Sequence, residues 1–363
     1  TRVESWARAM DSGRPDGPFN TYIIKPVFDA ITTYYTERRA PLEALVEVLR
    51  PLAGSLAGSG TIAAPELDGY VFQNKAELLH AILHTGNESN KSKLLRAGQV
   101  DVANEKTYQW APPVEKGSGV DTKQWDAFMA RMYAEGIITK ADMDAAQRVW
   151  NIFKETKGAA QKAHYRMFGF YFVTIEDSPV VTPFGTYPGG YVPAVTDKMM
   201  DIQGGARVDA DNLASQQNAS MFPNAEAGFT KARVESYAQP LELDILRIPA
   251  HLDRVMKFAY LGPTVREVAQ LVTGAPFRSM MNRFNRFAVD QLIIPWLQRT
   301  VRQSVTTGDA SRGWSRGLTA LSNRVGMQVM AGNIVNAAQQ LTGISSAAVI
   351  VPPKLLMKHL FHY

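Results

Sequence analysis

Apolar residues recur at helical spacing through much of this chain. In residues 27–50, Leu42, Leu45, Val46 and Leu49 return every three or four positions, and Pro41 suits a first helical turn. Similar patterns predict further helices over about 73–84, 121–134, 139–172, 276–288, 289–306, 313–331 and 333–348, with two more opened by Pro249 and Pro263. Most of the chain is therefore expected to be helical.

Short polar signals predict where several of these helices begin and end. Asp121 is a good N-cap for the helix that carries Trp125 and Phe128. Thr139 and Asp142 resemble a capping box in which Asp replaces the usual Glu. Gly86 is a plausible C-cap for the helix that ends near His84.

The remaining segments interrupt the helical pattern. Residues 54–69 and 97–120 are expected to be linker or loop, and 201–224 a surface loop, while 178–193 are rich in Pro, Gly and aromatic residues and predict turns with short strands. Alternation at 241–245 indicates another short strand. The fold class is thus mainly α, an elongated multi-helix assembly with a small loop- and β-rich insertion in the middle.

We divide the chain into three expected regions. Residues 1–120 form an N-terminal helical region with polar loops, and 121–274 form a long-helix region with the β-rich insertion. Residues 275–363 form a basic C-terminal helical region.

The amino-acid composition excludes several classes of site. The 363 residues include 45% hydrophobic and 20% charged residues, which is typical of a globular protein. They include no cysteine, which excludes disulfides, Cys-ligated zinc, iron–sulfur clusters and thiol catalysis. We expect no cofactor.

Positive charge gathers at the C-terminal end. Residues 275–363 contain ten Lys or Arg and two Asp, a balance of +8, so a net charge of +5 leaves −3 for residues 1–274. Arginine suits bidentate pairing with phosphate, so the candidates for nucleic-acid or phosphate contact are Arg278, Arg283, Arg286, Arg299, Arg302, Arg312, Arg316 and Arg324. The alternatives are a solvated helical surface or an interface with an acidic partner.

Residues 325–353 carry no charge but many amides. Asn333, Asn336 and Gln340 fall at helical spacing on one face, and Gln339 lies beside them. This face is too polar for a single lipid-embedded span, because isolated amides are costly in hydrocarbon. It suits a buried helix of a bundle, or a helix that lines a pore or meets a membrane after rearrangement, with Arg316, Arg324, Lys354 and Lys358 as interfacial anchors.

Two further clusters could bind ions. His80 and His84 are four residues apart on one helix face, near Glu77 and Glu88, and are a weak candidate for metal binding. The H-E-x-x-H motif is absent, and the alternative is a pair of core or capping imidazoles. The next turn carries an anion-loop candidate that is equally consistent with a structural cap and turn: Asn87, Ser89, Asn90, Lys91 and Lys93.

Catalytic motifs give no support for an enzyme. The sequence contains no phosphate-binding loop, dinucleotide fingerprint or G-x-S-x-G elbow, and the adjacent Glu176 and Asp177 do not imply an opposed acid–base pair. We expect no catalytic residues here, with any activity of a parent chain lying outside this segment.

Several stretches together carry a family resemblance. They are HTGNESNKSKLL (84–95), WDAFMARMYAEGIITKADMDAAQRVWNIFKETKGAAQKAH (125–164), TPFGTYPGGYVPAVTD (182–197), MFPNAEAGFTKARVESYAQPLELDI (221–245), PWLQRTVRQ (295–303) and VGMQVMAGNIVNAAQQLTG (325–343). They resemble a region of very large phage and prophage proteins, the multi-domain virion-internal or polyvalent proteins. Some of these are ejection proteins that leave the capsid with the genome.

The resemblance implies a structural segment of an ejection protein. Such a segment would help form the DNA-delivery channel across the host envelope, moving from the virion interior to the host periplasm and inner membrane. Its expected partners are copies of itself, other phage internal, ejection or tail proteins, phage DNA bound without sequence preference, and the envelope membrane. The alternatives are a soluble module of an injected anti-host-defence protein, or a metal-dependent hydrolase that uses His80 and His84.

Overall fold

The computed structural model describes residues 2–58, 60–101, 105–112, 119–172, 174–194 and 240–302, and these are mainly helical, as predicted. The helices are α1 (Arg2–Met10), α2 (Lys25–Glu37), α3 (Arg39–Leu49), α4 (Ala53–Gly58), α5 (Lys75–His84), α6 (Glu88–Ala97), α7 (Lys123–Ala134), α8 (Lys140–Phe168), α11 (Arg247–Tyr260), α12 (Gly262–Thr273), α13 (Ala275–Phe284) and α14 (Ile294–Arg302). Single π-helical turns at Asn20–Ile24 and Val289–Ile293 lead into α2 and α14, and a 3-10 turn spans Pro65–Leu67.

Three small antiparallel hairpins complete the described secondary structure. They pair β1 (Ile62–Ala64) with β2 (Tyr70–Phe72), β3 (Gln99–Asp101) with β4 (Lys106–Tyr108), and β5 (Val180–Thr182) with β6 (Gly185–Tyr187). The β5–β6 hairpin confirms the strands predicted in residues 178–193.

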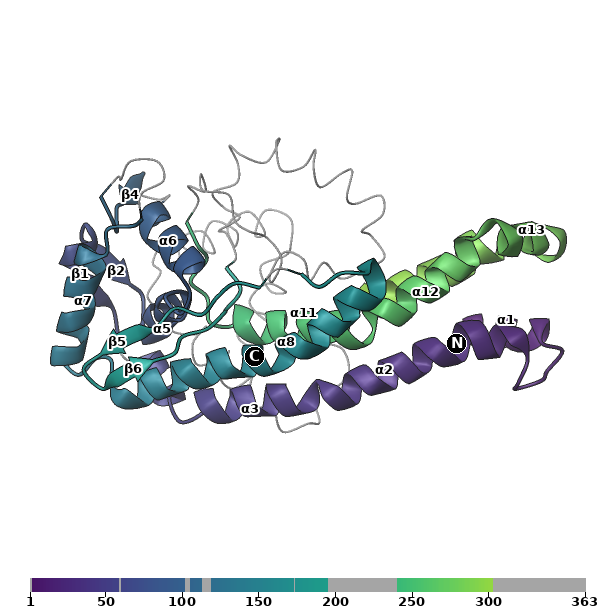
Figure 1. Ribbon diagram of the computed structural model, residues 1–363, viewed down its shortest axis with the longest axis horizontal. Helices are drawn as coiled ribbons and strands as arrows, with labels where there is room; N and C mark the ends of the chain where they lie inside the picture. The colour runs from purple at the N-terminus through teal and green to yellow at the C-terminus, as the bar shows by residue number, and fades with distance from the viewer. Residues whose placement is uncertain are drawn as a thin grey trace, which may run out of the picture.

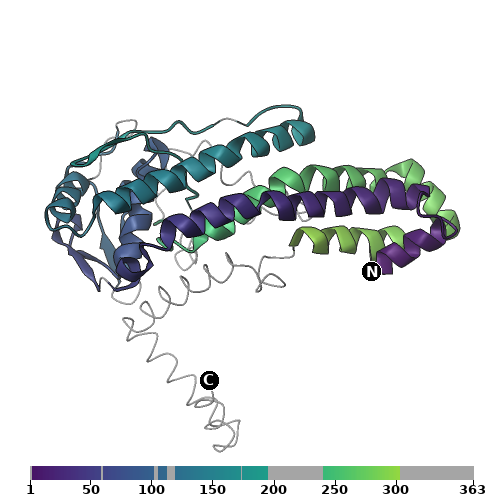
Figure 2. The same cartoon turned by 90° about the horizontal axis from the view of Figure 1, so that it is seen from below.

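The molecule is elongated, with a body at one end and a helical arm at the other (Figure 1). The body comprises α3 to α8, α11 and the hairpins around one hydrophobic cluster, whose large buried members include Phe72, Trp110, Phe128, Trp150 and Phe153. The arm comprises α1, α2, α12, α13 and α14 around a second cluster. Helices α2 and α3 run nearly in line from arm to body (Figure 2).

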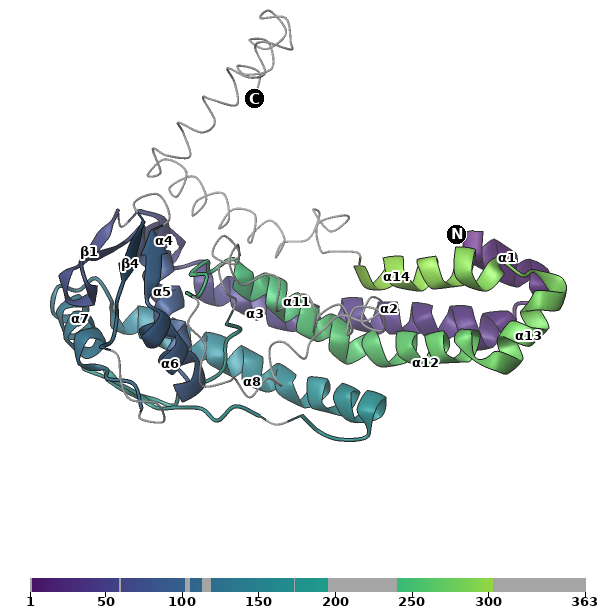
Figure 3. The same cartoon turned by 90° about the horizontal axis from the view of Figure 1, so that it is seen from above.

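The arm brings together the beginning and the end of the described chain. In Figure 3, α14 lies alongside α2 and α1, and α13 forms the outer end. The arm core joins Val27 of α2 with Val265 of α12 and Leu297 of α14, all of them buried. The three-region division of the sequence stays a prediction, because clusters of buried side chains do not define independently folding units.

The helix predicted over 27–50 is broken once. Helix α2 ends at Glu37 and α3 begins at Arg39, with Pro41 in its first turn. Proline has no amide hydrogen to bond the carbonyl four residues earlier, so the helix is interrupted there. The predicted apolar face of α3 is confirmed, because Leu42, Leu45, Val46 and Leu49 are buried.

Helix α8 begins with the predicted capping box. The Asp142 carboxylate accepts a hydrogen bond from the Thr139 amide at 2.7 Å and also pairs with Lys75 at 2.7 Å. The helix ends at Phe168, four residues before the predicted end. Gly169 adopts a left-handed φ of 81° there, which stops the helical hydrogen-bond pattern.

Other boundaries differ from the sequence predictions. The expected linker at 54–69 contains α4 and β1, and the expected loop at 97–120 contains the β3–β4 hairpin. The predicted strand at 241–245 is one isolated bridge at Leu241. There, Leu241 and Ile245 are buried while Leu243 is only partly so, which is not strand-like alternation.

Two of the predicted helix caps also differ from those in the structure. The residue that caps the C-terminus of α5 is Thr85, not Gly86. The N-cap of α7 is Thr122, while the Asp121 carboxylate accepts a hydrogen bond from the Lys123 amide at 3.0 Å.

Candidate functional site

The polar turn after α5 is hydrogen-bonded to a distant segment of the chain, residues 174–194, which we call the strap. Its centre is Gly86, whose carbonyl accepts hydrogen bonds from the amides of Ser178 at 2.9 Å and Gly190 at 2.7 Å. The indole of Trp150 in α8 lies against Gly86 and donates to the Leu83 carbonyl at 2.9 Å. Three stretches that carry the family resemblance, 84–95, 125–164 and 182–197, therefore meet here and stabilise one another.

The asparagines of the anion-loop candidate are used within this contact. Asn87 is buried, caps α6 by accepting from the Asn90 amide at 2.9 Å, and donates to the Gly190 carbonyl at 3.3 Å. Asn90 donates to the Val192 carbonyl at 2.8 Å. Both asparagines thus have a structural role, and anion binding stays a prediction for Ser89, Lys91 and the buried Lys93.

The two histidines of the metal candidate do lie together. The rings of His80 and His84 are 4.8 Å apart between centroids, and both are buried. Burial lowers the pKa of His80 to about 3, so its imidazole is neutral at pH 7. Within the part of the chain that the structure describes, no group of three or more His, Cys, Asp or Glu side chains could hold a metal ion.

Glu77, one turn before His80, has protein partners of its own. Its carboxylate accepts hydrogen bonds from the Tyr70 hydroxyl and, at 2.6 Å, from the Gln73 amide. Burial raises the pKa of Glu77 to about 7 despite these two bonds, which act in the opposite direction. The carboxyl group is therefore held inside the body, where it ties β2 to α5.

The predicted basic set is spread along the arm. Arg278 pairs with Asp290 through two contacts of 2.8 and 3.1 Å, whereas Arg283 and Arg286 are exposed at the outer end of α13. Arg299 is exposed on α14, the helix that also carries Arg302. Lying outside the described residues are Arg312, Arg316, Arg324, Asn333, Asn336, Gln339 and Gln340.

Sequence reasoning missed a buried charge cluster between the two hydrophobic cores. Asp253 of α11 pairs with Arg38 and with Lys257, each at 3.3 Å, and accepts a hydrogen bond from the Tyr34 hydroxyl. All four side chains are nearly buried. Burial, followed by the negative charge of Asp253, raises the pKa of Tyr34 well above its usual value, so the phenol remains a donor.

One signal for this cluster was present in the sequence. Asp253 and Lys257 stand four residues apart on a predicted helix, which is the spacing of an ion pair. The pairing of Asp253 with Arg38 could not be predicted, because the two residues are 215 positions apart in the sequence.

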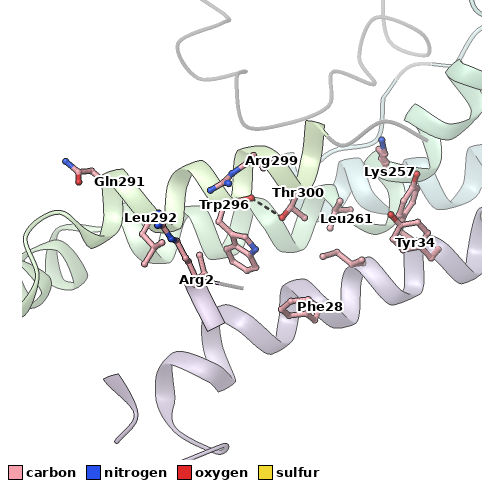
Figure 4. Close-up of a pocket in the computed structure, with 13 residues that line it drawn as sticks. Arg2, Phe28, Tyr34, Lys257, Leu261, Gln291, Leu292, Trp296, Arg299 and Thr300 are labelled. Carbon is pink, nitrogen blue, oxygen red and sulfur yellow. Dashed lines mark hydrogen bonds between the residues drawn. The ribbon is translucent and has the colours of Figure 1, made fainter. Parts of the chain in front are cut away.

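A pocket of about 410 Å³ lies beside the charge cluster, between α2 and α14 (Figure 4). Its wall is apolar, with the ring of Trp296 facing that of Phe28 at 6.3 Å between centroids. Its described lining includes three cations, Arg2, Lys257 and Arg299, and no Asp or Glu. Lys257 already pairs with Asp253 at 3.3 Å, so Arg2 and Arg299 are the lining cations that could meet an apolar group with negative charge.

Large apolar side chains are exposed at the outer end of the arm. Phe284 is 73% exposed, Phe287 60% and Met280 38%. The sequence signal is the segment FRSMMNRFNRF (277–287), in which arginine and phenylalanine alternate, but helical spacing alone did not tell which of them face the core. A second exposed aromatic group, Tyr165, Phe168, Phe170 and Tyr171, lies at the C-terminal end of α8.

Within the described residues, no helix combines the length and the apolar character needed to cross a bilayer. When the chain is compared with protein-family models, with curated proteins and with solved structures, nothing matches.

Proposed function

We propose that this chain is a structural segment of a bacteriophage internal virion protein, ejected with the genome and helping to form the DNA-delivery channel across the host envelope. The observation that carries the proposal is the arm, a long helical projection with its own apolar core and with exposed arginines at its outer end. The family resemblance of the sequence supplies the phage context.

The described geometry supports a binding role over a catalytic one. The polar clusters of the body are engaged in holding the fold: Gly86 and Asn87 fasten the strap, and Glu77 ties β2 to α5. The arm instead presents Arg283, Arg286 and Arg299 to solvent, where guanidinium groups can meet phosphate. The proposed partners are copies of this chain, other phage internal or tail proteins, and phage DNA.

Quantitative mass spectrometry of purified virions tests the proposal. Full particles are compared with ghosts after triggered DNA release, with a major capsid protein as the internal control. We expect peptides of this chain in full particles and their loss from ghosts. Retention in ghosts would make the protein a fixed part of the capsid or tail. Absence from both would contradict the proposal and favour an intracellular module or the hydrolase.

DNA contact has a separate test. If the arginines bind phosphates, the affinity of the full chain for duplex DNA falls steeply as salt rises, because binding releases counterions. A fluorescence-anisotropy titration at several salt concentrations measures the slope. An affinity that does not change between low and moderate salt would show that phosphate contact is wrong.

A further inference from the structure

The arm tip, α13 together with residues 285–287, has two different sides. On the inner side, Met281 is 1% exposed and packs in the arm core. On the outer side, Phe284 and Phe287 expose more than half of their surface, and Met280 more than a third. Exposed phenylalanine has no hydrogen bond to offer water, so two of them at one end of a molecule indicate a partner that removes them from water.

Two exposed arginines stand beside these phenylalanines in the sequence. Arg283 and Arg286 each directly precede one of the two exposed phenylalanines, and neither takes part in an ion pair with another described residue. The nearest cation along the helix, Arg278, is neutralised by Asp290 at 2.8 Å. Each apolar side chain is thus accompanied by a cation that is available for an anionic partner.

The neighbouring turn between α1 and α2 adds no strong opposing charge. This turn lies against α13, with the rings of Phe19 and Phe277 6.0 Å apart between centroids. Its Asp11 is buried and accepts hydrogen bonds from the amides of Phe19 at 3.0 Å and Asn20 at 2.8 Å. Asp16 is exposed, and so is the cation Arg14.

We infer that the arm tip docks on the surface of an anionic lipid bilayer, with Phe284 and Phe287 entering the interface and Arg283 and Arg286 on lipid phosphates. Such a bilayer offers apolar depth directly beneath a layer of negative charge, and arginine can hold its charge at the surface while a neighbouring ring is buried. The inference rests on the proposed function for the role of the arm as a contact surface, and it names the partner.

Two features favour lipid over nucleic acid. Single-stranded nucleic acid binds in positively charged grooves in which aromatic rings stack on bases, whereas the arm tip is a protruding end (Figure 3). Met280 is an aliphatic thioether that cannot provide a flat stacking face, yet it is exposed on the same helix as Phe284. Duplex DNA offers phosphates but no apolar layer for the two phenylalanines.

Vesicle co-sedimentation with the full chain tests the inference. The vesicles are phosphatidylcholine alone, or phosphatidylcholine mixed with phosphatidylglycerol. We expect binding to the mixed vesicles and little binding to the neutral ones. The double variant Phe284→Ser/Phe287→Ser should lower the affinity for mixed vesicles at least about tenfold. Arg283→Gln/Arg286→Gln should also lower it about tenfold at low salt, and by less at high salt.

Matched control variants show whether vesicle binding depends on the arm tip or on any exposed phenylalanine or arginine. Phe170→Ser removes a phenylalanine that is also 60% exposed, but at the end of α8, and Arg254→Gln removes an exposed arginine of α11. Both should bind mixed vesicles like the unmodified chain. All the substituted side chains at the tip are exposed, so circular dichroism and the thermal unfolding midpoint should stay unchanged.

Three outcomes would overturn the inference. They are no binding to mixed vesicles, unchanged vesicle binding by the double phenylalanine variant, or arginine variants that lose affinity for DNA while binding vesicles as before. Failure here is distinguishable from failure of the proposed function. A chain that leaves the virion with the genome but ignores vesicles keeps the function and loses the lipid partner, whereas a chain that binds vesicles but is absent from virions does the reverse.

Discussion

At the residue scale, two glycines of the body differ in the space that surrounds them. A Cβ on Gly86 would lie 2.6 Å from the indole nitrogen of Trp150 and 2.7 Å from the Gly190 carbonyl oxygen, far inside van der Waals contact. A Cβ on Gly158, inside α8, would meet no atom within 4 Å. The same substitution should therefore have opposite effects at the two positions.

We predict that Gly86→Ala lowers the free energy of unfolding by about 2–3 kcal/mol, because the indole of Trp150 and the backbone at Gly190 must move to admit the methyl group. Gly158→Ala should raise it by about 0.5–1 kcal/mol, because alanine has the higher helix propensity. Urea denaturation of both variants measures the difference. Equal effects of the two substitutions would show that Gly86 is not closely packed.

Glu77 should make stability depend on pH. Its pKa is about 7 in the folded protein, above the ordinary value of 4.5, so the folded state favours the protonated carboxyl. This contribution is fully present below pH 4.5 and is lost as pH rises through about 7. Burial of His80 acts in the opposite sense, because its neutral form favours folding as pH rises above 3.

We predict that Glu77→Gln removes the contribution of Glu77 to the pH dependence of stability and leaves the contribution of His80. Between pH 5 and pH 8, the unmodified chain should lose about 2 kcal/mol more stability than the variant, because the Glu77 carboxyl is protonated in the folded protein at pH 5 and ionised at pH 8. Denaturant unfolding at both pH values measures this double difference. Parallel pH profiles would show that Glu77 titrates normally.

At the element scale, a buried charge cluster joins the C-terminal end of α2 to the middle of α11. Asp253 pairs with both Arg38 and Lys257 inside the cluster. We predict that Asp253→Asn lowers the free energy of unfolding by about 3–5 kcal/mol, because a buried negative charge that pairs with two buried cations is removed.

Asp29→Asn is the matched control, since Asp29 pairs with Lys25 on the surface of α2 with both side chains more than 60% exposed. It should change stability by less than about 0.5 kcal/mol. Thermal and urea unfolding compare the two variants. A small effect of Asp253→Asn would mean that water reaches the cluster and screens it.

The elements themselves were largely predictable from local sequence. The apolar face of α3, the capping box of α8 and the β5–β6 hairpin are confirmed, because each depends on residues within a few positions of one another. All six described strands are three residues long, too short for an alternating pattern to stand out. The β5–β6 hairpin was predicted from the Pro, Gly and aromatic residues of 178–193, whereas 54–69 and 97–120 were interpreted as linker and loop, so the β1–β2 and β3–β4 hairpins were missed.

At the scale of the whole molecule, two hydrophobic cores are separated by the buried charge cluster. We predict that Leu297→Ala, in the arm core, accelerates amide hydrogen exchange in α12 and α14 and leaves α5 and α7 at their original rates. Leu79→Ala, in the body core, should do the reverse. Each substitution should cost about 2–5 kcal/mol. Uniform acceleration in both parts would show that body and arm unfold as one unit.

Local sequence also predicted part of the candidate sites, but not their contacts with distant segments. The sequence identified His80 with His84, and Asn87 with Asn90, as neighbours, because helical geometry places residues three or four apart on one face. It could not tell that the asparagines bond to the strap at Gly190 and Val192, about a hundred positions away. It also could not tell that Arg278 is paired while Arg283 and Arg286 are exposed.

Local sequence was enough to predict the helical class, most helix positions, one capping box and the concentration of arginine in residues 275–363. These follow from propensity, periodicity and composition, which act over a few residues or require no geometry at all. Only the tertiary structure decided that both ends of the described chain form one arm, that Asp253 meets Arg38, and that Phe284 faces outward while Met281 is buried. Contacts between distant segments depend on how all the elements pack together, and no local pattern specifies that arrangement.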